Sequence, residues 1–466
     1  MAKSGISLKA IAIVAIGFLV TVFVGIFVAF FGATVGEHYG ILIALPVTMI
    51  IGFLFLFDRY FLFLLIIIFR SAIDVALENT RFGNFGLGAV LNGLVILIAL
   101  IAMIERPEPV RRVVKQTWLP FLIITFIAVI ISPTPLPAIK IFLVLLSYAS
   151  VFAVAIALIK NEDDYARWMR AVFYSSFIPV AYAFIDIAHG GAVRQESEGF
   201  RISSTFSHPN AFAFYLVLMI SLSFYFYKSK EFKIPVFLRR TLPVYISIML
   251  ALLILTKTRS AWASCFAFFA IYALLYERKY LTFVFLAPVI AFMIPSVRDR
   301  FMDLAQGNEI INYSQLNSYA WRKLLWLSSI QFMDFNRYLF GYGLEAFKHY
   351  SLDFFALAGG KERAAHSVYV QLFFDAGAFG LLTFIWLHAR VGQLLMRFYM
   401  QNKLMIFSAI MFLLEFALNA YSDNMLAILS YDWYLWFILG AAYAVNYSKQ
   451  QSKQKQDETE SSLQRV

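Results

Sequence analysis

Long runs of apolar residues, separated by short polar stretches, fill most of this chain. A helix needs about 20 apolar residues to cross the hydrocarbon core of a bilayer, and by that measure the sequence predicts fourteen candidate spans. They lie near residues 9–31, 41–57, 60–75, 86–104, 117–132, 137–159, 169–189, 209–227, 242–257, 260–276, 280–296, 367–387, 404–421 and 425–446. The second and third are short and joined by a tight Asp58-Arg59 turn, and the ninth is also short, so twelve spans is an alternative count.

Only helices and closed barrels satisfy all backbone groups in lipid, and these segments are too long and too uniformly apolar for barrel strands. The sequence therefore predicts an all-α, polytopic transmembrane helix bundle of about 12–14 spans. Residues 1–296 would hold the first eleven candidate spans, and residues 297–366 a large helical loop with amphipathic stretches. Residues 367–446 would hold the last three spans. Residues 447–466, rich in Gln, Ser, Lys and Glu, would form a disordered tail.

Composition agrees with lipid as the solvent. Of the 466 residues, 61% are hydrophobic and 14% are charged, whereas soluble proteins have about 45–50% and about 25%. The first apolar run, Ile11 to Phe31, is too long for a signal peptide and is interpreted as a first span. Cys265 is the one cysteine, so no intramolecular disulfide can form. No Cys/His cluster has metal-ligand spacing, and we expect no metal and no cofactor.

The net charge of +11 raises the question of nucleic-acid binding, but the distribution of that charge favours membrane topology. With the N-terminus in the cytoplasm, the basic residues gather in the short loops that also face the cytoplasm, as the positive-inside rule requires. These loops and the tail contain most of the excess charge, at residues 106–115, 160–170, 228–240, 278–279, 390–403 and 449–465. We therefore expect a multi-pass protein of the bacterial inner membrane with both termini cytoplasmic, and no nucleic-acid partner.

Two polar clusters at span edges, which this orientation places on the outer face, could bind an anion. The first follows Arg201 and ends in His208-Pro209-Asn210 at the start of a span, where free backbone N–H groups can meet an anion. The second contains Lys257 and Arg259; a guanidinium suits phosphate because it donates two parallel hydrogen bonds. The alternatives are an ordinary interfacial loop with a capping motif and cations that snorkel to the interface.

Two further clusters belong to the large loop and the span after it. Arg322, between Trp321 and Trp326, could help form a sugar or phosphate surface, or simply lie on an amphipathic interfacial helix. His366 is the leading candidate for a general base because histidine titrates near physiological pH, although a lone histidine is usually an ordinary interfacial residue. Tyr369 and the intramembrane Asp375 follow.

Acidic residues inside spans are functional candidates by default. Asp375 lies nine residues after His366 and would share roughly the same helix face. Glu415 and Asp186 are further intramembrane acids. Each of the three could equally serve only to order helix packing.

Together the four places resemble the O-antigen ligase and O-antigen polymerase family of bacterial envelope glycosyltransferases. The family has an arginine followed by Gly-Thr-Phe-x-His-Pro-Asn; here Arg201 is followed by that run at residues 204–210, with Ser204 in place of Gly. A Thr-x-Ser-Arg-like element corresponds to residues 256–259, with Thr for Ser.

The large loop and the following span continue the resemblance. The family has an arginine shortly before a Trp and a Pro-Leu-x-Gly-x-Gly run, which correspond to Arg322, Trp326 and residues 338–343, with Tyr for Pro. A His-Asn-x-Tyr element, then an acid and two glycines, corresponds to residues 366–369 with Asp375, Gly377 and Gly380; the family often has Asn after the His and Glu as the acid. The likeness is close over about residues 195–385.

The resemblance implies a metal-independent inverting glycosyltransferase that takes its glycan from undecaprenyl diphosphate. It implies His366 as the base, Arg201 and Arg259 on the diphosphate with Arg322 as a weaker third cation, and supporting roles for His208, Asn210, Lys257, Tyr369 and Asp375. Partners would be the lipid-linked glycan donor, a lipid A-core or growing-glycan acceptor, and membrane lipids. The active site would be periplasmic, with the loop 297–366 as its lid.

Several interpretations stay open at this point. A ligase would attach a finished glycan to lipid A-core, a polymerase would join repeat units of O-antigen, capsule or exopolysaccharide, and a third variant would glycosylate a protein. A secondary transporter or lipid-linked glycan flippase is the alternative from another class, because intramembrane acids suit it. A structural membrane protein without catalysis is the third possibility, and it would make none of the four places important.

Overall fold

The computed structural model describes residues 39–79, 81–82, 85–105, 107–190, 200–229, 234–302 and 316–463. Within these ranges the fold is a helical bundle, with a small hairpin of two-residue strands, β1 (Arg81–Phe82) and β2 (Phe85–Gly86). The bundle helices are α2 (Tyr39–Phe69), α4 (Leu87–Glu105), α5 (Pro107–Ile130), α6 (Pro135–Leu158), α7 (Glu162–Tyr174), α8 (Phe177–Ala188), α9 (Pro209–Lys228), α10 (Val236–Leu255), α11 (Arg259–Leu275), α12 (Leu281–Met293), α16 (Val368–Met396), α17 (Lys403–Ser422) and α18 (Leu429–Leu463).

The described part of the chain contains nine helices long and apolar enough to cross a membrane, which confirms the all-α polytopic class. Five predicted spans differ. The second and third correspond to a single candidate span, Met49–Phe69. α11 has 17 residues and α12 has 13, with Pro288 inside it, so neither reaches the length of a full span. The first part of α18 carries polar residues and is not among the nine. The span predicted at residues 9–31 lies outside the described residues.

The turn predicted at Asp58-Arg59 is present. Asp58 leaves the helical region of backbone space within α2, with φ −152° and ψ 74°. Its carboxylate accepts a hydrogen bond of 3.0 Å from the N–H of Phe61, as a capping residue does at the start of a new helical segment.

The core of the bundle is aromatic and lies between α6, α9 and α18. Trp433, Trp436, Tyr148, Tyr215 and Tyr434 are fully buried. α6 and α18 share the largest helix contact, and Gly440 allows it because a Cβ there would lie 2.7 Å from the carbonyl oxygen of Phe152. Close approach of backbones through small residues is the usual way in which helices pack in membranes.

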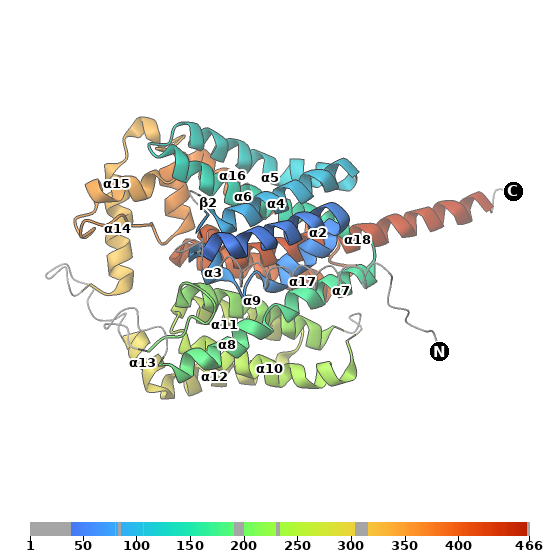
Figure 1. The fold of residues 1–466 in the computed structure, drawn as a ribbon. Helices are drawn as coiled ribbons and strands as arrows, with labels where there is room; N and C mark the ends of the chain where they lie inside the picture. Colours follow the sequence, from blue (N-terminus) through green and yellow to red (C-terminus); the bar gives the residue numbers. More distant parts are fainter. Residues whose placement is uncertain are drawn as a thin grey trace.

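The helices of the large loop lie at one end of the bundle, which we call the loop end (Figure 1). They are α13 (Pro295–Met302), α14 (Ser318–Phe332) and α15 (Ala346–Phe354). The last part of α18 projects from the opposite end (Figure 1). The sequence predicted disorder from about residue 447, whereas α18 continues as an exposed helix to Leu463. Its Lys, Gln and Glu residues are good helix formers, so this polar segment can be helical.

Candidate functional site

The segment before α9 is fixed at the loop end by hydrogen bonds to its backbone and hydroxyl groups. The carboxylate of Asp186, on α8, accepts from the N–H groups of Ser203 (2.8 Å) and Ser204 (3.0 Å). Ser204 has a left-handed backbone, with φ 52°, and its hydroxyl donates to the carbonyl of Pro179. Left-handed backbone suits glycine best, which explains why Gly is the residue expected at this position of the motif. Asp186 therefore holds this segment in place.

Arg201 is buried within this segment and binds two neighbouring helices. Its Nε donates to the carbonyl of Thr256 (2.8 Å), at the end of α10, and its NH2 donates to the side-chain oxygen of Asn210 (2.7 Å), on α9. A third contact reaches the hydroxyl of Thr258 at 3.3 Å. The structure thus joins the first two predicted clusters at one buried positive charge.

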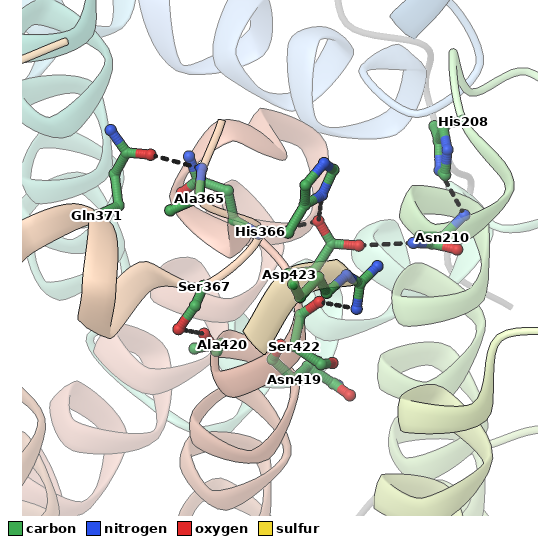
Figure 2. A network of polar contacts seen from close by, with 12 residues as sticks. His208, Asn210, Ala365, His366, Ser367, Gln371, Asn419, Ala420, Ser422 and Asp423 are labelled. Atoms are coloured by element: carbon green, nitrogen blue, oxygen red, sulfur yellow. Dashed lines mark hydrogen bonds and ion pairs between the residues drawn. The ribbon is translucent and has the colours of Figure 1, made fainter. Parts of the chain in front are cut away.

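Asn210 connects that arginine to an acid which the sequence analysis did not single out. Its Nδ2 donates to Oδ2 of Asp423 at 2.6 Å. Asp423 directly follows α17, and its Oδ1 lies 3.8 Å from Nδ1 of His366 (Figure 2). Residues 201, 210, 366 and 423 therefore form one network from four separate segments. The imidazole of His366 is 40% exposed and the Asp423 side chain 15%, so the imidazole is open to a substrate while the acid behind it is shielded.

Electrostatics keeps Asp423 ionised. Burial by itself would raise the pKa of this carboxyl. Hydrogen bonding to His366, the positive charges of His366 and Arg322, and the hydrogen bond from Asn210 outweigh that effect and hold the pKa of Asp423 well below its usual range. A carboxylate beside an imidazole can orient the ring and stabilise the imidazolium once it forms.

α14 covers this network and contributes Arg322. The guanidinium NH1 of Arg322 donates to the carbonyl of Ser422 at 2.5 Å, directly before Asp423. Trp326, one turn further along α14, donates from its indole nitrogen to the carbonyl of Ala365 (2.6 Å), directly before His366. α14 therefore binds the backbone carbonyl that directly precedes each member of the His366–Asp423 pair.

Arg259, the first residue of α11, fastens the other part of the loop. Its guanidinium donates to the carbonyl of Arg300, on α13, at 2.8 Å and to the hydroxyl of Ser318, the first residue of α14, at 2.7 Å. Ser318 lies one turn before Arg322 on the same helix. The three predicted arginines thus approach the loop end from three segments, and each is linked through protein contacts to the surroundings of His366.

The supporting residues predicted from sequence take different positions. His208 caps α9, and its Nδ1 accepts from the N–H of Asn210 at 3.1 Å. Lys257 lies in the turn between α10 and α11, with a left-handed φ of 54°. The hydroxyl of Tyr369 donates to the carbonyl of Ala417 at 2.9 Å and so ties α16 to α17. His208 thus contacts Asn210, a member of the network, and Tyr369 lies three residues after His366.

Asp375 binds the loop. Its carboxylate accepts from the N–H groups of Glu345 (3.1 Å) and Phe347 (2.8 Å), at the start of α15, and from Nε2 of Gln371 (2.8 Å). The expectation that Asp375 shares a helix face with His366 is wrong, because α16 begins only at Val368 and His366 lies before the helix. A carboxylate at a helix N-terminus stabilises that helix.

The break in α16 is filled by residues 338–343. The backbone N–H groups of Tyr342 and Gly343 donate to the carbonyls of Phe374 and Asp375, at 3.0 and 2.8 Å. In the other direction, the N–H of Ala378 donates to the carbonyl of Tyr338 at 2.7 Å. We call this pairing of residues 338–343 with residues 374–379 the backbone clasp. It fixes the second half of the loop, from residue 338 onward, to the bundle.

No metal-binding group emerges in the described ranges: three or more His, Cys, Asp or Glu side chains nowhere come together there. The polar groups around His366 are instead guanidinium, imidazole, amide and one carboxylate. Such a set can bind a multiply charged anion through arginine and move a proton through histidine.

The residues that sequence reasoning missed are Asp423 and Gln371. Asp423 carried a weak signal, an acid directly after a span at the loop end, but no spacing connected it to residue 366. Gln371 is an uncharged residue inside a span, which gives no signal from composition.

In comparison with known families, residues 244–385 match the family model described as O-antigen ligase. The match begins within α10 and ends within α16, so it includes Arg259, Arg322 and His366. Arg201 and Asp423 lie outside it. No curated protein matches the chain significantly.

Proposed function

We propose that this protein, whose residues 244–385 match the O-antigen ligase family model, is a glycosyltransferase of surface polysaccharide assembly. It would transfer a glycan from undecaprenyl diphosphate to a hydroxyl of an acceptor sugar. The observation that supports this most is the pairing of the half-exposed imidazole of His366 with the shielded carboxylate of Asp423, with Arg322 bound to the carbonyl directly before Asp423.

In this proposal His366 is the general base. It takes the proton of the acceptor hydroxyl as that oxygen attacks the anomeric carbon of the donor, within hydrogen-bond reach. The bond from the anomeric carbon to the diphosphate oxygen breaks, and its electron pair leaves with the diphosphate. Asp423 stabilises the imidazolium that results. Attack opposite the leaving group inverts the anomeric centre.

The arginines would stabilise the negative charge that grows on the diphosphate. Preorganised cations act most strongly where charge develops in the transition state. Arg201 supplies a buried, fixed positive charge, and Arg259 and Arg322 supply two more from α11 and α14. With three guanidinium groups in this role, we propose a reaction that needs no divalent cation.

We further propose that the loop end faces the periplasm and that the protein lies in the bacterial inner membrane. Basic residues gather at four helix connections that alternate along the chain with connections at the loop end, as expected for cytoplasmic loops. These four connections are α4–α5, α6–α7, α9–α10 and α16–α17. The last part of α18 would then be cytoplasmic.

A transfer assay with the full-length protein tests the proposal. The protein is reconstituted in lipid nanodiscs with an undecaprenyl-diphosphate-linked glycan and, in separate reactions, lipid A-core or a second lipid-linked repeat unit. We expect glycan transfer and release of undecaprenyl diphosphate, unchanged by EDTA. Product with lipid A-core identifies a ligase, and elongated lipid-linked glycan identifies a polymerase. The absence of product with either acceptor, combined with movement of the donor across liposomes, would establish a flippase instead.

The Asp423 carboxylate gives a pH prediction. Because the pKa of Asp423 is depressed, this carboxylate is fully ionised above about pH 4, the ordinary pKa of an Asp side chain. Its interaction with the imidazolium is lost only when the pH falls further, through the depressed pKa. Asp423→Asn removes the negative charge, which disfavours the imidazolium. We expect the acid limb of the kcat profile to move about one unit to lower pH, together with a lower maximum. The exposed Asp353→Asn on α15 is the control; an unshifted limb in Asp423→Asn would remove Asp423 from this role.

A further inference from the structure

The backbone at His366 is held in an uncommon conformation. Its φ is 50°, in the left-handed region that costs a non-glycine residue free energy unless its surroundings impose it. Both neighbours of His366 are fixed. Ser367 reaches the carbonyl of Ala420 at 3.4 Å, and Ala365 is bound at its carbonyl by Trp326. Such strain is common where a side chain must point in one direction.

The N–H of Ala365 is bound by Gln371. Oε1 of Gln371 accepts from this N–H at 3.1 Å (Figure 2). The amide itself is held by Asp375, which accepts from Nε2 of Gln371 at 2.8 Å. Because one end of the amide must donate to a carboxylate, the other end must be the acceptor that meets Ala365. Gln371 is 6% exposed and Asp375 2%, so water does not compete well for these bonds.

Asp375 in turn is fixed by α15 through the N–H groups of Glu345 and Phe347. The contacts therefore form a continuous chain from the start of α15 to Asp375, Gln371, the peptide of Ala365 and the imidazole of His366. Each bond is 2.8–3.1 Å long. This chain approaches His366 through its backbone, on a different route from the contact of Asp423 with its ring.

We propose that Gln371, oriented by Asp375, is a positioning residue that aims the imidazole of His366. The inference rests on the proposed function of His366 as the base. It couples the docking of the outer loop to the placement of the base, because the same carboxylate binds α15 and Gln371. When residues 345–347 leave Asp375, Gln371 loses its orientation, and His366 loses the restraint on its backbone.

Gln371→Met tests this role because it keeps the length and apolar volume of the side chain and removes both hydrogen bonds. In the nanodisc transfer assay we expect kcat to fall about tenfold, with KM for donor and acceptor changed less than twofold. Gln393→Met, at an exposed position of the same helix, should match the wild type. A rise in KM with unchanged kcat, or wild-type kcat, would overturn the proposal.

A double variant separates positioning from a general structural effect. Residues that act through one another show non-additive losses. The residual activity of His366→Ala should therefore not fall further when Gln371→Met is added. A further tenfold loss in the double variant would show that Gln371 acts independently of His366. Wild-type activity of His366→Ala alone would instead contradict the proposed function itself, so the two failures are distinguishable.

A second pair of variants covers the case in which Gln371→Met does not fold. Gln371→Glu keeps an oxygen acceptor for Ala365 but places a second carboxylate against Asp375, and kcat should fall. Adding Asp375→Asn exchanges the amide and the carboxylate between the two positions, and we expect this pair to recover part of the kcat lost by Gln371→Glu. If the exchanged pair is no better than Gln371→Glu alone, the proposed orientation by Asp375 is wrong.

Discussion

A strain that lacks this gene and carries His366→Ala is expected to lose its long surface glycan while the lipid-linked donor accumulates. General bases contribute about 10²–10⁴-fold to rate, so kcat in the transfer assay should fall by about that factor, with little change in the KM for the donor. The His366 side chain is 40% exposed; its ring centroid lies 6.1 Å from that of Trp321, and its Nδ1 lies 3.8 Å from Oδ1 of Asp423. Its removal should therefore leave the folded protein intact.

The matched control is His349→Ala. His349 is an exposed histidine on α15, in the same loop. The His349→Ala variant should therefore restore normal glycan to the strain that lacks the gene. The intermediates left by His366→Ala carry further information: single repeat units on the carrier indicate a lost polymerase, and long unattached chains indicate a lost ligase. Normal glycan in cells that express His366→Ala would exclude His366 as the base.

Topology was predictable because its causes are local. The apolar runs gave the class of fold, and the turn at Asp58 followed from one acid and one arginine between two runs. The lengths of α11 and α12 did not follow, because an apolar window carries no information on where the turn at residues 276–281 ends one helix and begins the next. The helical tail of α18 shows that polarity alone does not predict disorder when the residues are good helix formers.

The site was predictable in part. Arg201, Arg259 and His366 lie at predicted span edges and Arg322 lies in the large loop, and the positive-inside rule assigns all four to one face. Their common location at the loop end could therefore be predicted. Contacts between segments that are distant in the sequence could not be predicted. Asp423 is 57 positions after residue 366, and nothing in the spacing joins them. The role of Asp375 was also out of reach, because its partners are backbone N–H groups, which no sequence pattern displays.

These contacts also bear on the transporter alternative. A coupling acid must exchange its proton or ion during the cycle. Asp186 and Asp375, two of the three acids that raised this possibility, each accept two hydrogen bonds from backbone N–H groups of a loop segment. Both carboxylates are therefore committed to holding a loop segment. Glu415, bonded to Ser221 at 2.6 Å, is the acid on which a test of transport should concentrate.

The backbone clasp should be sensitive to a single methyl group. A Cβ at Gly377 would lie 2.3 Å from both the carbonyl carbon and the carbonyl oxygen of Leu339 and 2.5 Å from the nitrogen of Phe340. These are backbone atoms, and they can move only if residues 338–343 leave the break in α16. Gly377 also has φ 68°, which adds conformational strain. We expect Gly377→Ala to destabilise the folded protein by about 3–5 kcal/mol.

Thermal unfolding in detergent, followed by fluorescence-detected size-exclusion chromatography, measures this effect. Gly360→Ala is the matched control, because φ there is 70° but no atom lies within 4 Å of the added Cβ; it isolates strain from steric overlap and should lower the midpoint only slightly. In Gly377→Ala the N–H groups of Tyr342 and Gly343 lose their carbonyl partners, and α15 separates from Asp375. Glycan transfer should then be lost together with stability. Equal midpoints for the two variants would mean that the clasp opens at little cost and that the loop is free to move as a lid.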